Sequence, residues 1–231
     1  MLLTLPIRDV LPTTARASIV RLDLQGQRFP FAAGQAVFVA SHGSEPRRPY
    51  SIASAPDDVV RDGYLELLIG LTADGTPSGH LHLRRAEFVD MEGPFGRFTL
   101  PDAPREQRCL FIAGGTGISP LRAMLRQALS MRFASLGVLY SARTPDDFAY
   151  EDELRALAAE GRVELRLTVT RDTSSRWNGP RGRISPELLG SLLHDPATLC
   201  FVCGPRTLVE TVPKTLGGLG VAADRIRLED W

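Results

Sequence analysis

The stretch CLFIAGGTGISPLRAMLRQAL, residues 109–129, decides the fold of this chain. It opens with a continuous apolar run at 109–113, as expected of a strand buried on both faces of a sheet. A glycine-rich turn at 114–117 follows, and apolar residues then recur at helical spacing from Leu121 to Leu129. A buried strand that leads through glycines into an amphipathic helix is typical of a parallel α/β sheet.

The same alternation continues to the C-terminal end. Helices are predicted at 150–159 and 188–193 and directly after Gly204-Pro205. Buried strands are predicted at 137–141, 163–169, 199–203 and 226–228. Strands that alternate with helices indicate βαβ units and a parallel sheet.

The residues before this region follow a different period. Short strands with period-two alternation are predicted at 20–24, 37–39, 50–52, 65–71 and 88–91, with Gly, Pro and Asp clusters between them. Many short strands at this spacing favour an antiparallel barrel or sandwich. Two prolines punctuate residues 101–106. We therefore expect an antiparallel β-barrel over 1–102 and an α/β parallel-sheet nucleotide-binding domain over 103–231.

Composition excludes several classes of function. The 231 residues are 43% hydrophobic and balance 27 basic against 27 acidic side chains, which argues against nucleic acid as a partner. No apolar run reaches about 18 residues, so we expect no membrane span. Residues 1–14 lack a basic segment of the secretory type, and we expect a cytoplasmic protein. Three cysteines, Cys109, Cys200 and Cys203, fit neither a disulfide framework nor a metal site, and no metal is expected.

The turn at 114–117 has the chemistry of an anion site. Glycines let the backbone turn tightly and approach a ligand. Ser119 is expected as the N-cap of the following helix and Pro120 in its first turn. The N–H groups of such a helix start favour a pyrophosphate. Alone, the turn fits a tight connection as well as a dinucleotide site; the flanking strand and helix favour the site.

Two other segments could bind a nucleotide. In Arg48-Pro49-Tyr50-Ser51, the guanidinium suits a phosphate, and Tyr50 projects to the same side of an extended chain. The alternative is an edge-strand tyrosine beside a solvated arginine. Cys203 ends an apolar strand before Gly204-Pro205, at the edge where parallel sheets bind ligands. The alternative is a buried small hydrophobe, which is how we interpret Cys200.

Taken together and in this order, these segments resemble the ferredoxin–NADP reductase superfamily. That superfamily includes flavodoxin reductases, oxygenase reductase components and NAD(P)H-flavin reductases. The flavin motif is matched by residues 48–51, and the nicotinamide-nucleotide motifs by 114–120 and 203–205. Weaker matches are the phosphate-binding turn and helix start at 75–78, the Gly-Pro-aromatic-Gly turn at 92–98, and the ending Glu229-Asp230-Trp231.

The resemblance implies roles for individual residues. Arg48 would pair with the flavin pyrophosphate, Tyr50 would stack on the isoalloxazine, and Thr76 and Ser78 would donate to the phosphates. Trp231 would cover the other flavin face. The expected catalytic residues are Ser51, near flavin N5, and Cys203 and Glu229, which border the nicotinamide. The residues expected to bind a cofactor are Arg48, Pro49, Tyr50, Ser51, Ile69, Thr76, Pro77, Ser78, Gly114, Gly115, Thr116, Gly117, Pro120, Arg143, Arg171, Arg183, Cys203, Gly204, Pro205 and Trp231.

The implied activity is that of a flavoprotein oxidoreductase. A hydride would pass from NAD(P)H to bound FAD, and electrons would then pass to a separate ferredoxin, flavodoxin or oxygenase component. Arg143, Arg171 and Arg183 stand where NADP-preferring relatives carry arginines, which favours NADP(H) over NAD(H). Tyr150 would stack on the adenine. Two alternatives stay open: a free-flavin reductase, and a nucleotide-sensing or electron-transfer subunit without turnover.

Overall fold

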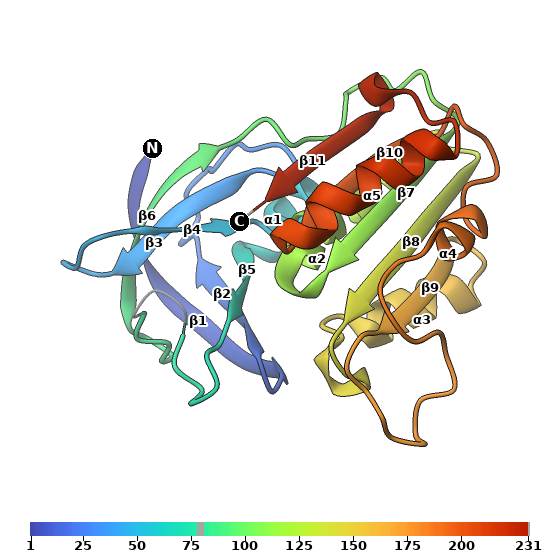
Figure 1. The fold of residues 1–231 in the computed structure, drawn as a ribbon. Coiled ribbons are helices and arrows are strands. Elements are labelled where there is room, and N and C mark those ends of the chain that lie inside the picture. The colour runs from blue at the N-terminus through green and yellow to red at the C-terminus, as the bar shows by residue number, and fades with distance from the viewer. Residues whose placement is uncertain (78–80, 231) are drawn as a thin grey trace.

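The first sheet is antiparallel and barrel-like. The computed structural model describes residues 1–77 and 81–230. Six strands form this sheet in the order β4-β3-β6-β1-β2-β5 (Figure 1). Their bounds are β1 Leu2–Thr14, β2 Ala17–Asp23, β3 Ala36–Ser41, β4 Arg48–Ser51, β5 Tyr64–Gly70 and β6 Phe88–Phe95. A single isolated bridge, Ile52 to Leu67, joins the two edges, so the expected barrel is confirmed as a curled sheet that stays open along β4.

Two elements of this half were not predicted. β1 pairs with both β2 and β6 at the centre of the sheet. Its register shifts between Ile7 and Asp9 and again between Pro12 and Thr14. Such bulges interrupt the period-two pattern by which a strand is recognised. The helix α1, Pro56–Asp62, occupies a segment expected to be a turn, because its Pro-Asp-Asp start suits a helix N-terminus equally well.

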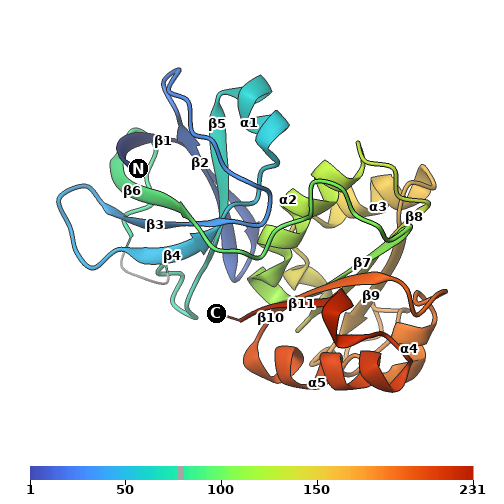
Figure 2. The same ribbon diagram turned by 90° about the horizontal axis from the view of Figure 1, so that it is seen from above.

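The second sheet is parallel throughout and has the order β11-β10-β7-β8-β9. Its strands are β7 Arg108–Gly114, β8 Ser135–Ala142, β9 Glu164–Val169, β10 Leu199–Gly204 and β11 Ile226–Asp230. The helices are α2 Ile118–Ala128, α3 Glu151–Ala159, α4 Pro186–Gly190 and α5 Arg206–Gly218, with short 3₁₀ helices η1 Gly115–Gly117, η2 Pro145–Asp147 and η3 Ala223–Arg225. Figure 2 shows α2 and α3 on one face and α4 and α5 on the other. The predicted α/β half is confirmed.

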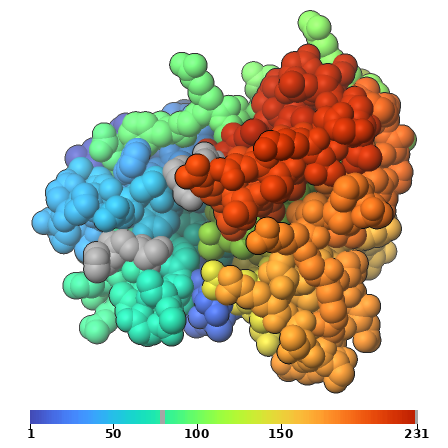
Figure 3. All heavy atoms as spheres, viewed as in Figure 1, coloured from blue at the N-terminus to red at the C-terminus, as the bar shows by residue number. Residues whose placement is uncertain are grey.

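The two halves share a hydrophobic core. One cluster of buried side chains joins Ala53 and Leu68 of the antiparallel half to Ile118 and Met124 of α2. A second cluster fills the antiparallel sheet, and a third lies under α4 and α5. Figure 3 shows the antiparallel half, coloured blue through cyan to teal-green, in contact with the yellow, orange and red part of the α/β half. We call this boundary the seam. In the part of the chain that the structure describes, no helix is long and apolar enough to cross a membrane.

Candidate active site at the seam

Glycines in η1 and at the end of β10 let the turn after β7 pack closely against the end of β10. A Cβ added at Gly117 would lie 2.3 Å from the carbonyl oxygen of Cys203. A Cβ at Gly204 would lie 2.9 Å from the backbone nitrogen of Gly114. Real Cβ contacts are longer, so only glycine fits without a shift at these positions. The turn predicted to bind a dinucleotide is therefore packed directly against the end of β10.

A cleft of about 680 Å³ lies at the carboxyl ends of the parallel strands. Its floor is the glycine-rich turn, residues 114–117, and α5 contributes Thr207, Leu208 and Thr211. The antiparallel half closes the other side with Thr14, Arg16 and Leu68. Ligands of open α/β sheets bind at this edge. Both halves of the protein thus form one wall each of the same cleft.

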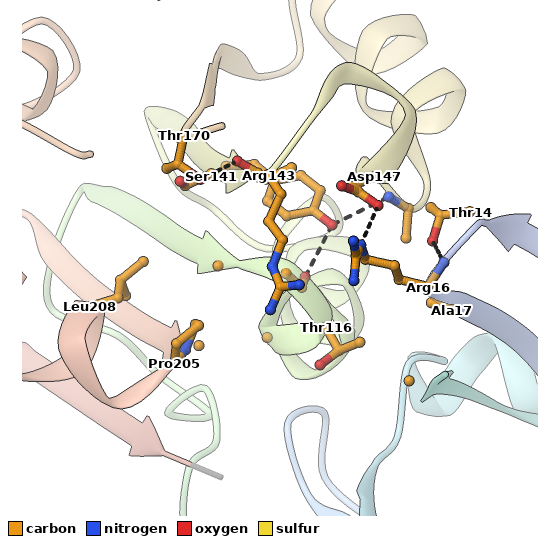
Figure 4. A pocket seen from close by; sticks show the side chains of 18 of the residues that line it. Thr14, Arg16, Ala17, Thr116, Ser141, Arg143, Asp147, Thr170, Pro205 and Leu208 are labelled. Carbon is orange, nitrogen blue, oxygen red and sulfur yellow. Dashed lines mark hydrogen bonds and ion pairs between the residues drawn. The ribbon is translucent and has the colours of Figure 1, made fainter. Parts of the chain in front are cut away.

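Many predicted binding residues line this cleft together. They are Gly114, Gly115, Thr116, Gly117, Arg143, Arg171, Arg183, Gly204 and Pro205. The three arginines are exposed, and no ion pair joins their guanidinium groups to another residue among 1–77 and 81–230. Figure 4 shows the Arg143 side chain extending across the cavity toward the turn that carries Thr116. The cleft therefore presents unneutralised positive charge to a ligand.

Among the lining residues that sequence reasoning missed, three make side-chain contacts that shape the cleft. Arg16, in the turn between β1 and β2, places Nε 3.5 Å from Oδ1 of Asp147, which bridges the two halves at the cleft (Figure 4). Asp147 in turn accepts a hydrogen bond of 2.8 Å from Thr144 Oγ1. Tyr140 donates to the Gly115 carbonyl oxygen at 3.0 Å, and burial raises the pKa of its phenol, which keeps the hydroxyl a donor. No local sequence signal marks contacts between residues so far apart in the chain.

The predicted flavin strand, β4, lies at the open edge of the antiparallel sheet. Arg48 and Pro49 are exposed, whereas Tyr50 and Ser51 are buried. Ile69 lies in the core of that half with 1% of its surface exposed. Thr76 and Pro77 border a separate hollow of about 540 Å³, and residues 72–77 and 81–87 hold no helix. Ser78 and Trp231 lie outside the described residues. Of the residues in this group that the structure describes, none lines the cleft.

Cys203 and Glu229 stand opposite each other on the paired strands β10 and β11. Cys203 has no exposed surface and packs in the core that spans the seam. Glu229 is partly exposed, and its Oε1 lies 4.0 Å from the position of a Cβ at Gly96, in the link that leaves β6. The Glu229 carboxylate therefore reaches from the parallel sheet toward the antiparallel half.

The expected roles of Ser119 as a helix N-cap and of Tyr150 as an adenine platform are wrong. Ser119 is not the N-cap of α2, because Gly117 holds that position, and Ser119 Oγ donates instead to the Ser51 carbonyl oxygen at 2.9 Å. Pro120 does lie in the first turn of α2 but is buried away from the cleft. Tyr150 is buried at the seam with the Arg122 guanidinium carbon 4.2 Å from its ring centroid. The ring is therefore already covered and cannot stack on an adenine.

Comparison with known families matches both halves of the chain. Residues 6–100 match the family model described as an oxidoreductase FAD-binding domain. Residues 111–214 match that of an oxidoreductase NAD-binding domain. Residues 101–110, between the two matches, include the polar stretch at which the sequence predicts the division.

Relatives cover between two thirds and nearly all of this chain. Ferredoxin--NADP reductase B of Sorangium cellulosum (strain So ce56) is 37% identical over 97% of this chain and 94% of its own length. Methane monooxygenase component C of Methylosinus trichosporium is 35% identical over 68% of this chain, which spans 48% of that protein. NADH-cytochrome b5 reductase 2 of Scheffersomyces stipitis is 30% identical over 76% of this chain and 59% of its own length.

A solved structure shares the architecture. A ferredoxin NADP+ reductase from Neisseria gonorrhoeae, with bound FAD and NADP, aligns with a TM-score of 0.83 at 23% identity, over 99% of this chain and 98% of that one. At this identity the likeness establishes the fold alone.

Proposed function

Since the chain belongs to the ferredoxin–NADP reductase family of FAD- and NAD-binding oxidoreductases, we propose that it takes a hydride from NADPH onto bound FAD and delivers electrons to a separate protein. The observation that carries this proposal is the cleft at the seam. Its floor is a glycine-rich strand–helix turn, its walls come from both halves, and its rim carries three arginines without acidic partners among the described residues.

The glycine-rich turn fits a dinucleotide pyrophosphate. A Cβ at Gly115 would meet no protein atom within 4 Å, so the backbone there faces open space in the lining of the cleft. The Tyr140 hydroxyl donates to the Gly115 carbonyl oxygen and so helps to hold the turn, and N–H groups at such a helix start favour an anion. The residues of this wall would bind and orient the nucleotide, with Gly204 and Pro205 supporting them from β10.

The open edge of the antiparallel sheet fits the flavin. Among residues 1–77 and 81–230, β4 pairs with β3, and its other edge has no paired strand until Ile52 meets Leu67. Along this edge Arg48 would bind phosphate, Tyr50 would pack on the ring, and Ser51 would hydrogen-bond to it. When bound, FAD supplies the hydride acceptor and the one-electron donor that the protein lacks. Buried Cys203 and partly exposed Glu229 would then border the nicotinamide.

The choice of NADPH over NADH rests on the arginines. An arginine fork suits the adenosine 2′-phosphate of NADPH, and NADH has no such group. Of the named relatives, one carries NADP in its name and another NADH. Since the relatives differ in the nucleotide that they are named for, we assign the preference for NADPH to the arginines at the rim of the cleft. Arg143, Arg171 and Arg183 are the residues to test.

Anaerobic titration of the purified flavoprotein with each nucleotide tests this preference. Arg143→Gln, Arg171→Gln and Arg183→Gln should each raise the NADPH concentration for half-maximal flavin bleaching by about 10-fold, because a charged hydrogen bond contributes about 1.5–3 kcal/mol. The NADH concentration for half-maximal flavin bleaching should change little in these variants. Arg155→Gln is the control, since Arg155 pairs with Glu151 on α3 and does not line the cleft. Faster bleaching of the unmutated protein by NADH would refute the preference.

The acceptor is tested on the holoprotein. A chain that stays yellow through gel filtration and reduces a ferredoxin, flavodoxin or oxygenase component with NADPH supports the proposal. A colourless chain that turns over added flavin would instead be a free-flavin reductase. Failure to oxidise either nucleotide with any artificial acceptor would favour a sensing or electron-transfer subunit.

A further inference from the structure

One face of α2 carries polar side chains into the seam. Ser119, Arg122 and Arg126 recur at intervals of three and four residues, so they lie on the same side of the helix. Each of them contacts the antiparallel half. The helix starts directly after the dinucleotide turn at 115–117, and this face therefore connects the predicted nucleotide site to the flavin half.

Ser119 and Arg122 hold the backbone of the predicted flavin strand. Ser119 Oγ donates to the Ser51 carbonyl oxygen at 2.9 Å, and Arg122 Nη1 donates to the Ala53 carbonyl oxygen, also at 2.9 Å. These are alternate carbonyls of one extended segment. The Ala53 N–H donates in turn to the Glu66 carbonyl oxygen on β5 at 2.8 Å, which also holds the segment to β5.

Arg122 is itself locked in place. Its guanidinium contacts Glu66 Oε1 at 2.9 Å and Glu153 Oε2 at 2.6 Å, and it lies over the Tyr150 ring. The side chain is only 12% exposed. Two carboxylates and a ring, from β5 and from α3 with its N-cap Tyr150, thus fix a guanidinium that would otherwise have several rotamers.

We infer that Ser119 and Arg122 are positioning residues for hydride transfer. They fix Ser51 relative to the turn at 115–117, and with it the distance and angle between the two cofactor sites. This inference rests on the proposed function, in which Ser51 faces the flavin. Rates of such reactions depend steeply on alignment, and a misplacement of about 1 Å costs about 100-fold. Neither residue needs to touch a cofactor to have this effect.

The test compares two serine variants of the flavin-loaded protein. Ser119→Ala removes the hydroxyl that holds Ser51. Ser130→Ala is the matched control, because Ser130 Oγ also donates to a backbone carbonyl, Gln127 O at 2.8 Å, but at the exposed far end of the same helix. Stopped-flow mixing with NADPH gives the limiting rate of flavin reduction and the apparent dissociation constant, while gel filtration and thermal unfolding report flavin retention and stability.

Ser119→Ala should lower the limiting rate by about 10-fold or more and leave the dissociation constant within about 2-fold. Ser130→Ala should change neither quantity. A Ser119→Ala protein with an unchanged limiting rate, or a rate loss shared equally by Ser130→Ala, overturns the inference. So does a variant that loses flavin or stability while its remaining holoprotein reacts at the normal rate. If unmutated protein is not reduced by NADPH or NADH, the proposed function fails and the inference fails with it.

Arg122→Met provides the second measurement. It removes the bond to Ala53 but leaves Ser119 in place, so the limiting rate should again fall more than nucleotide affinity does. Arg155→Met is its control on the surface of α3. A loss of thermal stability without any loss in the limiting rate of flavin reduction would show that Arg122 stabilises the fold but does not position Ser51.

Discussion

At the residue scale, the absence of a side chain matters as much as any functional group. The carbonyl of Cys203 and the backbone of Gly114 occupy the space where side chains at Gly117 and Gly204 would begin. The close packing of the turn after β7 against the end of β10 brings the dinucleotide turn, Cys203 and the start of α5 together. The missing Cβ atoms at Gly117 and Gly204 therefore allow the packing that forms the cleft floor.

Gly117→Ala should disturb this contact. The new Cβ would lie 2.3 Å from a backbone oxygen that cannot rotate away, and overpacking of this kind costs about 1–3 kcal/mol. Urea unfolding measures the loss, and NADPH titration should show weaker binding. Gly218→Ala, at the end of α5 with no atom within 4 Å, is the control and should be neutral or stabilising by about 0.4–1 kcal/mol. Equal effects from the two variants would contradict the argument.

Asp90 on β6 should make stability depend on pH. Burial acts to raise the pKa of its carboxyl, but His42, the Gly43 N–H and Thr4 hydrogen-bond to the carboxylate and lower the pKa to about 2. A depressed pKa in the folded state contributes stability above the unfolded value of about 3.9, and that contribution is lost as pH falls toward about 2.

Asp90→Asn should therefore lower the free energy of unfolding at pH 7 by about 1–2 kcal/mol. The difference from the unmutated protein should shrink as pH falls from about 4 to about 2. Chemical denaturation across this pH range provides the measurement, and Asp102→Asn, at an exposed position, should change stability by less than about 0.5 kcal/mol. A difference that stays constant with pH would show that Asp90 does not titrate as described.

At the element scale, α2 has two faces with different tasks. Its apolar residues, such as Leu121, Met124 and Leu125, are buried in the core that spans the seam. Its polar face binds the antiparallel half through Ser119, Arg122 and Arg126. Arg126 hydrogen-bonds to both carboxylate oxygens of Asp58 on α1 and to Glu153 on α3, so one side chain joins three helices.

Arg126→Met should destabilise the protein by about 1–3 kcal/mol, because two partly buried carboxylates each lose one of their two arginines; Arg61 stays paired with Asp58 and Arg122 with Glu153. Arg126→Met combined with Asp58→Asn should cost less than the sum of the two single variants, since the second change removes a charge that Arg126 no longer balances. A double-mutant cycle by urea unfolding measures this coupling, expected at about 1–2 kcal/mol. If the two losses of unfolding free energy simply added, the interaction between Arg126 and Asp58 would contribute nothing to stability.

At the scale of the whole molecule, the two halves form one packed body. The cluster that contains Phe111 and Phe201 of the parallel sheet also contains Ala17, Ala53 and Leu68 of the antiparallel half. The cleft lies at the boundary that this cluster supports. Separation of the halves would expose the cluster and dismantle the cleft at the same time.

This shared core predicts a single unfolding transition of the holoprotein. In differential scanning calorimetry, the calorimetric enthalpy should equal the van't Hoff enthalpy. This expectation differs from the usual behaviour, because chains longer than about 150 residues often unfold through intermediates. Two resolved transitions, or calorimetric enthalpy well above the van't Hoff value, would show that each half is stable alone.

The parts of the fold that sequence predicted are those with uninterrupted local patterns. Residues 109–129 form a strand, a glycine turn and a helix as expected. β1 escaped prediction because its bulges break the alternation, and α1 because Pro56-Asp57-Asp58 fits a turn and a helix start alike. Of the candidate residues, nine line the cleft, while the roles assigned along β4 and β11 stay predictions.

The linear chain by itself determined where buried strands alternate with helices and which glycines join them, because hydrophobic period and backbone freedom are local properties. Only the tertiary structure decided that Arg16 bridges to Asp147, that Ser119 holds Ser51, and that Tyr150 lies under Arg122. These contacts join residues from 28 to 131 positions apart. No local pattern encodes them, since the first two depend on how the halves pack across the seam and the third on how α2 packs beside the start of α3.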